Sequence, residues 1–337
     1  MIFYNLLTDT VQLLLDHPSI DVNHGDKDGQ TALHFASANG RSDTVKLLLD
    51  HTQVDVNQGD INGITPLIEG SRNGQIETMK LLLGHSQIDV IQGDKDNRTA
   101  LWWASNARQP DAVKLLLNQT QVDVNEGDVY GITALIQASY LGFSDIVEIL
   151  LNHTNIQVNL GENKRRTALW LASYKGHSGV YKLLLADSRV DVNRADFEGV
   201  SPLIRASQNP TPDLVYRLLR HPGLVNVNQA DKNRRTALWW AAYSGKGDGG
   251  GSVYRIKKHP SVDLNRQDIN GQTPLYAACG ANGAGAIFNE MAITHLLAEP
   301  RVNVNQQARN GRTPLIHATE EGQAEAAGTQ LNRISFG

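Results

Sequence analysis

The chain has 337 residues, of which 40% are hydrophobic and 20% are charged, and its formal net charge is −4. Without an excess of basic residues, no overall positive field favours nucleic acid. Cys279 is the single cysteine, which excludes an intramolecular disulfide and is typical of a reducing compartment. The first ten residues lack the basic and apolar regions of a signal peptide, and no apolar run reaches the length of a membrane span. We therefore expect no membrane association and a cytoplasmic location, with the nucleus as the alternative.

An incomplete copy of a recurring pattern stands first in the chain. Residues 11–17 read VQLLLDH, which predicts a short amphipathic helix, while residues 1–9 are too few for a full helix before it. We expect residues 1–23 to form a partial N-terminal repeat.

The complete pattern is clearest over residues 128–159, DVYGITALIQASYLGFSDIVEILLNHTNIQVN. Thr133 predicts the start of a first helix, because its hydroxyl can accept a hydrogen bond from a free amide of the first turn. Gly142 predicts the end of that helix, since glycine adopts the left-handed conformation at little cost. Ser144 predicts the start of a second helix, which carries apolar residues at helical spacing. Two such helices cannot bury their apolar faces alone, so they need similar neighbours on both sides.

The signature of the first helix, Thr/Ser-(Ala/Pro)-Leu, recurs along the chain at steps of 34, 34, 34, 34, 34, 35, 37 and 40 residues. Its first residue is Thr31, Thr65, Thr99, Thr133, Thr167, Ser201, Thr236, Thr273 or Thr313. The second helix reads VKLLLDH, MKLLLGH or VKLLLNQ in the early repeats, and an exit turn of the type VDVN follows it.

The signature, the downstream V-x-x-L-L and the D-V-N turn together resemble the ankyrin repeat over almost the whole chain. The resemblance implies an all-α ankyrin-repeat solenoid of stacked antiparallel helix pairs with projecting β-hairpin or turn tips. It implies a single domain over residues 1–337, with a degenerate C-terminal repeat at 313–337. It also implies protein binding through the tips and the concave face of the first helices. Arg108 and Pro210 depart from the pattern, because glycine closes the first helix elsewhere.

The later repeats are less regular than the middle ones. A longer loop, SGKGDGGGS, follows Tyr243, and the next helix places Arg255 and Lys257 where other repeats have leucine. A charge at a buried position must reach solvent or cause strain. We expect residues 244–337 to open more readily than the middle of the chain, which hydrogen exchange would test.

The repeats also alternate between two classes, with a period of about 68 residues. The candidate partner-binding residues are the basic tips Lys95, Arg98, Lys164, Arg166, Lys232 and Arg235, the apolar tips Tyr130, Ile132, Phe197 and Val200, and the tyrosines Tyr140, Tyr174 and Tyr243 at the ends of first helices. One interpretation is a groove for an extended partner that carries acidic and apolar side chains. The other is that the alternation only fits neighbouring repeats together. The sequence leaves both open.

Tryptophan alternates with isoleucine at the position of the family histidine, which is itself present only at His34. Trp102, Trp170 and Trp239 could form a stacking platform for nucleic-acid bases. Core packing is the favoured interpretation, because large and medium residues in alternate layers interdigitate.

Catalytic and metal-binding signals are weak. Gly245, Gly247 and Gly250 match G-x-G-x-x-G, but they follow a helix and not the strand that a phosphate loop needs. The histidines that end successive second helices stand a whole repeat apart, so we expect no shared metal. The exit-turn asparagines are hydroxylation candidates, with turn hydrogen bonding as the simpler interpretation. The sequence therefore predicts a protein that is not an enzyme and that binds neither a cofactor nor a metal.

Three functions remain. The first is a non-catalytic scaffold, monomeric, that binds a protein partner. The second is the recognition segment of a larger signalling protein, a NACHT-type ATPase or a ubiquitin-ligase adaptor. The third is a nucleic-acid binder that uses the basic tips.

Overall fold

The computed structural model describes residues 2–209, 212–221, 225–244, 251–280 and 286–320. These residues form eighteen helices and no strand, and their strand-like pairings are isolated bridges, such as those of Gly127 with Thr133 and of Ala230 with Thr236. The predicted all-α repeat fold is therefore confirmed. The chain divides into two compact units, residues 1–163 (unit 1) and 164–337 (unit 2).

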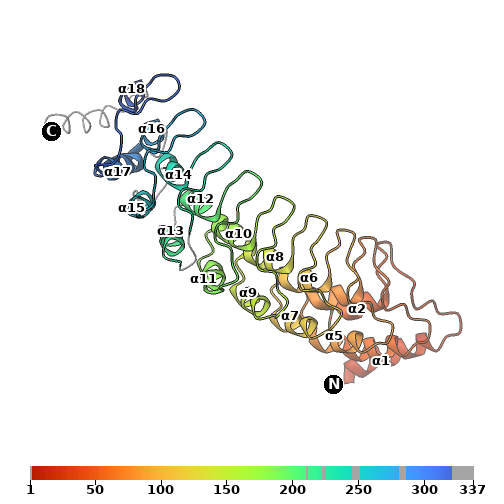
Figure 1. Cartoon of the computed structure of the whole chain (residues 1–337). Helices are drawn as coiled ribbons and strands as arrows, with labels where there is room; N and C mark the ends of the chain where they lie inside the picture. The colour runs from red at the N-terminus through yellow and green to blue at the C-terminus, as the bar shows by residue number, and fades with distance from the viewer. Residues whose placement is uncertain (1, 210–211, 222–224, 245–250, 281–285, 321–337) are drawn as a thin grey trace. The chain divides into compact units, whose positions relative to one another are not determined.

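Each unit consists of two rows of helices, with the turns projecting beside the inner row (Figure 1). The inner helices of unit 1 are α2 (Ala32–Ala38), α4 (Pro66–Arg72), α6 (Ala100–Asn106) and α8 (Ala134–Leu141). Its outer helices are α1 (Ile2–Leu15), α3 (Ser42–Leu49), α5 (Ile76–Leu83), α7 (Pro110–Leu117) and α9 (Ser144–Leu151). In unit 2 the inner helices are α10 (Ala168–Lys175), α12 (Pro202–Ser207), α14 (Ala237–Ser244), α16 (Pro274–Cys279) and α18 (Pro314–Glu320). Its outer helices are α11 (Ser178–Ala186), α13 (Pro212–Leu219), α15 (Gly251–Lys257) and α17 (Ala286–Leu297).

The helix boundaries follow the predicted capping residues. Thr133 Oγ1 accepts a hydrogen bond from the Ile136 amide at 3.3 Å, and Gly142 ends α8 with φ of 83°. Such a cap typically stabilises a helix by about 1 kcal/mol. The same cap is seen at the signatures of α4, α6, α10, α12 and α16. The starts of these inner helices are therefore encoded locally.

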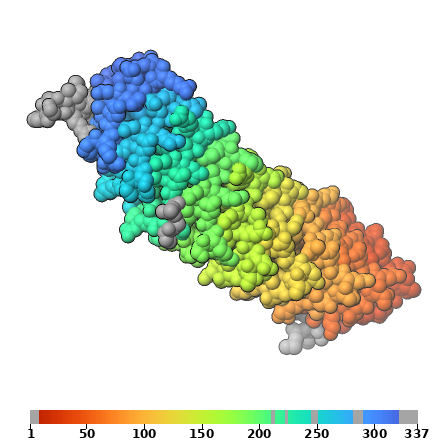
Figure 2. Space-filling view, viewed as in Figure 1, coloured from red at the N-terminus to blue at the C-terminus, as the bar shows by residue number. Residues whose placement is uncertain are grey.

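The core lies between successive repeats. Inner helices contact inner helices and outer helices contact outer helices, so the space-filling view shows the repeats of each unit closely packed (Figure 2). In the repeat of α8 and α9, Leu135, Ile136, Ile146 and Leu150 are buried. Truncating a buried leucine to alanine typically costs about 2–5 kcal/mol. No repeat could retain this burial without its neighbours.

Arg108 occupies the left-handed position that glycine holds in other repeats, with φ of 54°. Its guanidinium lies 3.2 Å from the Asp145 carboxylate and over the Phe143 ring. The expected turn therefore forms at Arg108, and the ion pair and ring contact offset part of its backbone strain. The corresponding Pro210 lies outside the described residues.

Exit-turn asparagines connect each repeat to the next. Asn57 Nδ2 donates to the Gln87 carbonyl at 2.7 Å, and Asn57 Oδ1 accepts from the Asp89 amide at 2.8 Å. The same pair of bonds recurs at Asn23, Asn125, Asn228 and Asn265. We call this arrangement the asparagine clamp. Its bonds join successive exit turns, so the asparagine side chains bond between repeats and not only within their own turn.

Ile91 replaces the clamp asparagine in the third exit turn, and its side chain is 56% exposed. The residues that would meet a clamp, Gln121 and Asp123, instead line a cavity of about 270 Å³ with Ile91. This exit turn therefore lacks the asparagine clamp that its neighbours in unit 1 have.

Lys257 does not reach solvent. Its side chain is buried, its Nζ donates to the His295 carbonyl at 2.8 Å, and the Glu299 carboxylate lies 3.3 Å from it. Arg255 instead places its guanidinium 4.7 Å from the centre of the Tyr216 ring. The charge of Lys257, at a position where other repeats have leucine, is therefore balanced by an ion pair between α15 and the turn after α17. The expected easier opening of residues 244–337 stays a prediction.

Candidate functional site

The candidate residues of unit 1 divide between exposed and half-buried positions. Lys95 and Tyr130 are exposed at the turn tips, Ile132 is half-buried, and Tyr140 is exposed at the end of α8. Arg98 is half-buried, pairs with Asp94 and Asp96, and lies over the Trp102 and Trp103 rings. Its guanidinium is thus largely engaged within its own repeat.

In unit 2, Lys164, Phe197 and Lys232 are exposed at the tips, and Lys232 pairs with Glu198 of the preceding tip. Val200 is buried, with 8% of its surface exposed, so the prediction that its side chain faces a partner is wrong. The residue precedes the signature of α12, where the chain has already turned into the core.

The arginines next to the signatures lie over the tryptophans of their own repeats. The Cζ to ring-centre distances are 5.2 Å for Arg98 and Trp102, 5.5 Å for Arg166 and Trp170, and 5.4 Å for Arg235 and Trp239. Arg235 also pairs with Asp231 at 2.9 Å. The co-occurrence of arginine and tryptophan in one class of repeat therefore has a packing explanation, since each guanidinium covers an indole ring.

At the turn tips of unit 2, arginine in one repeat class stands where the other class has glycine. Gly131 and Gly199 have positive φ, and the equivalent positions Arg165 and Arg234 have φ of 63° and 61°. A left-handed conformation costs a non-glycine residue about 1–2 kcal/mol. Sequence reasoning missed these two arginines, because a positive φ cannot be read from an arginine.

Trp102, Trp170 and Trp239 are buried, as expected for core packing. Trp103 and Trp240 are half-buried and donate their indole N–H to Asp94 and Asp231. A stacking platform needs exposed ring faces, so burial of the first three weighs against base stacking there.

Two exposed tyrosines and one arginine lie on three successive inner helices of unit 2. Tyr174 on α10 and Tyr243 on α14 are 49% and 46% exposed. Arg205, on α12 between them in sequence, lies with its Cζ 4.4 Å from the Trp170 ring centre and 5.3 Å from that of Tyr174. We call the half-buried or exposed side chains of Tyr174, Arg205, Trp240 and Tyr243, together with the buried Trp170 that Arg205 covers, the inner wall of unit 2.

Tyr243 continues the wall along α14. Its ring is stacked on Trp239 at 5.1 Å and meets Trp240 edge-on at 6.0 Å. Rings fixed in this way lose little side-chain entropy when a partner covers them. Sequence reasoning missed Arg205, because it belongs to the repeat class in which only apolar contact residues were predicted.

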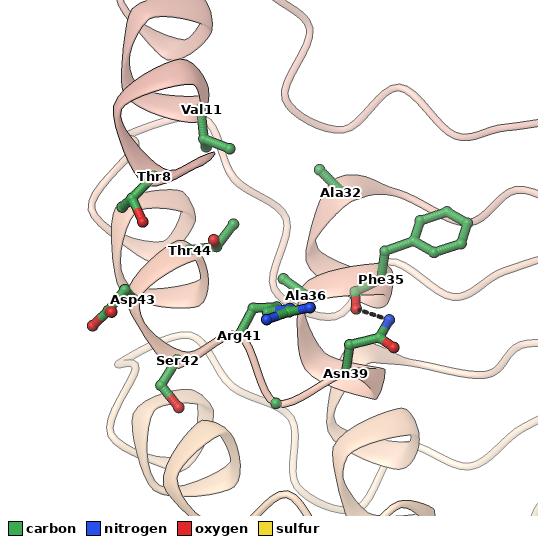
Figure 3. Close-up of a pocket in the computed structure, with 11 residues that line it drawn as sticks. Thr8, Val11, Ala32, Phe35, Ala36, Asn39, Arg41, Ser42, Asp43 and Thr44 are labelled. Carbon is green, nitrogen blue, oxygen red and sulfur yellow. Dashed lines mark hydrogen bonds between the residues drawn. The ribbon is translucent and has the colours of Figure 1, made fainter. Parts of the chain in front are cut away.

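A separate cavity of about 680 Å³ opens between α1, α2 and α3 in unit 1 (Figure 3). Phe35, Ala32, Ala36 and Val11 supply its apolar lining, and Arg41 and Asp43 lie at its polar side. Phe35 is 49% exposed.

The described residues contain no group of three or more His, Cys, Asp or Glu side chains that could hold a metal ion. Burial raises the pKa of the Cys279 thiol to about 12, so this thiol is a poor nucleophile. Within the described chain, no helix is both long and apolar enough to cross a membrane.

Comparison with known proteins gives the same architecture. A family model described as ankyrin repeats (3 copies) matches residues 2–94, 54–128, 89–162, 121–196, 169–249 and 248–329. Inversin-B of Xenopus laevis is 40% identical over 74 residues, which is 21% of this chain and 7% of that protein. Inversin of Canis lupus familiaris is 30% identical over 92 residues, 27% of this chain and 8% of that protein. The chain thus spans less than a tenth of the length of these relatives.

Among solved structures, the crystal structure of EF0377, an ankyrin repeat protein, matches 54% of this chain and 93% of its own, with 28% identity and a TM-score of 0.49. Ankyrin repeats are protein-interaction modules and typically non-catalytic. Because the family model matches nearly all of the sequence, this chain belongs to the ankyrin-repeat family.

Proposed function

We propose that this chain is a non-catalytic scaffold that binds a protein partner through the inner wall of unit 2 and the adjoining turn tips. The observation that carries the proposal is the exposure of Tyr174 and Tyr243 on the inner helices, with the half-buried Arg205 next to Tyr174. Tyrosine, tryptophan and arginine are the side chains that dominate protein-interface energies.

The tips support the same assignment. Arg165 and Arg234 take a left-handed conformation that glycine would take more cheaply. Strain of this kind is retained where the side chain has a use. Arg165 lies 5.6 Å from the ring centre of the exposed Phe197, so adjacent tips together offer a basic and an apolar group.

The chemistry of the surface indicates its partner. Exposed Lys164, Phe197 and Lys232 at the tips alternate basic and apolar character along unit 2. An extended segment with acidic and apolar side chains complements such a surface. We infer that the protein acts as a monomer in the cytoplasm or nucleus.

The test is a binding measurement with partner proteins identified by affinity capture and then purified. Tyr174→Ala and Tyr243→Ala should each weaken binding by about tenfold or more, as expected for truncation of an interface anchor. Tyr216→Ala is the control, because Tyr216 is similarly exposed at 38% but lies on the outer helix α13. Loss of affinity only in Tyr216→Ala would place the binding surface on the outer row.

A second candidate is that this array is the recognition segment of a larger protein, such as a NACHT-type ATPase or a ubiquitin-ligase adaptor. The match to only 7% and 8% of the inversins favours it, because a similar segment there is part of a much longer chain. Sequencing the full transcript tests this candidate. A reading frame that adds no further domain would reject it.

A further inference from the structure

Arg205 is the group of the inner wall that the chain itself leaves least satisfied. Its Nη1 donates to Gln208 Oε1 at 2.6 Å, but its Nε is buried without an acceptor. Among the residues that the structure describes, no carboxylate forms an ion pair with it. A charge that is partly removed from water without a counter-ion is costly, so pairing with an anion would lower the free energy of this site.

A second cation increases that cost. Arg166 lies 5.5 Å from the centre of the same Trp170 ring that Arg205 covers at 4.4 Å. Burial lowers the pKa of Arg205, the charge of Asp196 offsets part of this effect, and the charge of Arg166 adds to it. Two guanidinium groups therefore converge on one indole.

The fold does not require this arginine. Glu69 in α4 and Gln137 in α8 stand at the same place relative to their signatures, and each has a partner in unit 1. Glu69 pairs with Arg72 at 3.2 Å, and Gln137 Nε2 donates to Asn106 Oδ1 at 2.7 Å. Since α8 accepts glutamine at this position, the arginine of α12 calls for another explanation than helix packing.

We infer that Arg205, held by Trp170 and Tyr174, forms a carboxylate-binding subsite for an aspartate or glutamate side chain of an extended partner segment. This inference rests on the proposed function. Arginine presents a planar fork of donors that matches a carboxylate, and stacking on rings holds that plane in place. An apolar side chain next to the acidic residue would cover the exposed ring of Tyr174.

The test uses the full chain and a phage library of random dodecapeptides. Peptides selected on the wild type should carry an acidic residue beside an aromatic or aliphatic one. One selected peptide is then synthesised together with its isostere, in which the acidic residue is changed to Gln or Asn. The wild type should bind the acidic peptide about 10- to 100-fold more tightly than the isostere, as expected for a charge-assisted hydrogen bond.

Arg205→Gln, which reproduces the residue that α8 carries, should bind both peptides alike. Arg220→Gln is the matched control, because it removes the same charge from the exposed surface of the outer row. It should keep the wild-type preference. Circular dichroism and the unfolding midpoint of Arg205→Gln confirm that the array is intact.

Undiminished preference for the acidic peptide in Arg205→Gln would overturn the subsite. The proposed function would still stand if Tyr174→Ala and Tyr243→Ala weaken peptide binding. Selected peptides that lack acidic residues, or displacement of the acidic peptide by a thymidine oligonucleotide but not by a second acidic peptide, would also overturn the subsite. Failure of every inner-wall substitution to affect peptide binding would contradict the proposed function itself.

Discussion

The indole Nε1 of Trp170 donates a 2.9 Å hydrogen bond to the carbonyl of Val200, thirty residues ahead in the next repeat. In unit 1 the ring Nε2 of His34 lies 2.9 Å from the carbonyl of Ile64, which is also thirty residues ahead. His34 Nδ1 accepts from the Thr31 amide, so its Nε2 carries the proton and donates. Trp170 therefore replaces the family histidine both as a core residue and as the donor that ties one repeat to the next, whereas the indole N–H groups of Trp102 and Trp239 are buried without a partner among the described residues.

Trp170→Phe should lower the free energy of unfolding by about 1 kcal/mol more than Trp102→Phe. Both substitutions remove the same ring volume, but Trp102 Nε1 is buried without a partner and loses no hydrogen bond. Chemical denaturation of the two variants measures the difference. Equal losses would show that the bond between Trp170 and Val200 contributes nothing to the coupling of repeats.

Ile91→Asn should raise the free energy of unfolding by about 1 kcal/mol, because asparagine can form the clamp with Gln121 and Asp123 that neighbouring repeats possess. The gain belongs to the coupling between two repeats, so it should sharpen the cooperativity of unfolding as well. Asn57→Ile is the reverse experiment and should lose a similar amount. An Ile91→Asn variant with an unchanged free energy of unfolding would mean that water already satisfies the backbone groups of Gln121 and Asp123 that the clamp would bind.

Glu69→Gln should stabilise the protein increasingly as the pH rises from 4 to 7. Glu69 is 4% exposed, and burial raises its pKa above the usual 4.5, although Arg72 opposes the shift. The folded state thus holds the proton more tightly than the unfolded state. The stability that this carboxyl gives is complete below pH 4.5 and is lost as the pH passes through the raised value.

Unfolding midpoints at several pH values measure the effect of Glu69→Gln. Glu77→Gln on the surface of α5 is the control, since it removes an exposed carboxylate that is paired with Lys80. A constant difference between Glu69→Gln and the wild type at all pH values would contradict the prediction.

Glu299→Gln should lower the free energy of unfolding by about 1–3 kcal/mol, because it leaves the buried ammonium of Lys257 without its counter-charge. Lys257→Leu restores the residue type of the other outer helices and should leave stability unchanged or higher. Thermal unfolding of both variants measures whether Glu299→Gln loses stability while Lys257→Leu does not. A Lys257→Leu variant as unstable as Glu299→Gln would show that the ion pair itself holds α15 in place.

The sequence predicts the repeats well because their signals are local. The Thr133 cap and the turn at Gly142 depend on neighbours within one or two turns of helix. The residue four places after each signature threonine behaves differently. It is glutamate at Glu69, glutamine at Gln137 and arginine at Arg205, and its burial and pairing depend on the adjacent repeats.

That dependence explains why Arg205 was missed. Val200 was wrongly expected to be exposed because the chain has already turned into the core before the signature of α12. Arg98, Arg166 and Arg235 were predicted as tip residues from their charge alone, whereas their place over tryptophan rings follows from the path of the turn. Their part in partner binding stays a prediction, as does the single domain over residues 1–337.

The most direct measurement of the central claim places a photo-crosslinking amino acid at Tyr174 or at Tyr216 of the full chain and exposes it to the purified partner. Crosslinks should form from position 174 on the inner wall, disappear when the acidic peptide is added, and be absent from position 216 on the outer helix. Crosslinks from position 216 alone, unaffected by the peptide, would contradict the account.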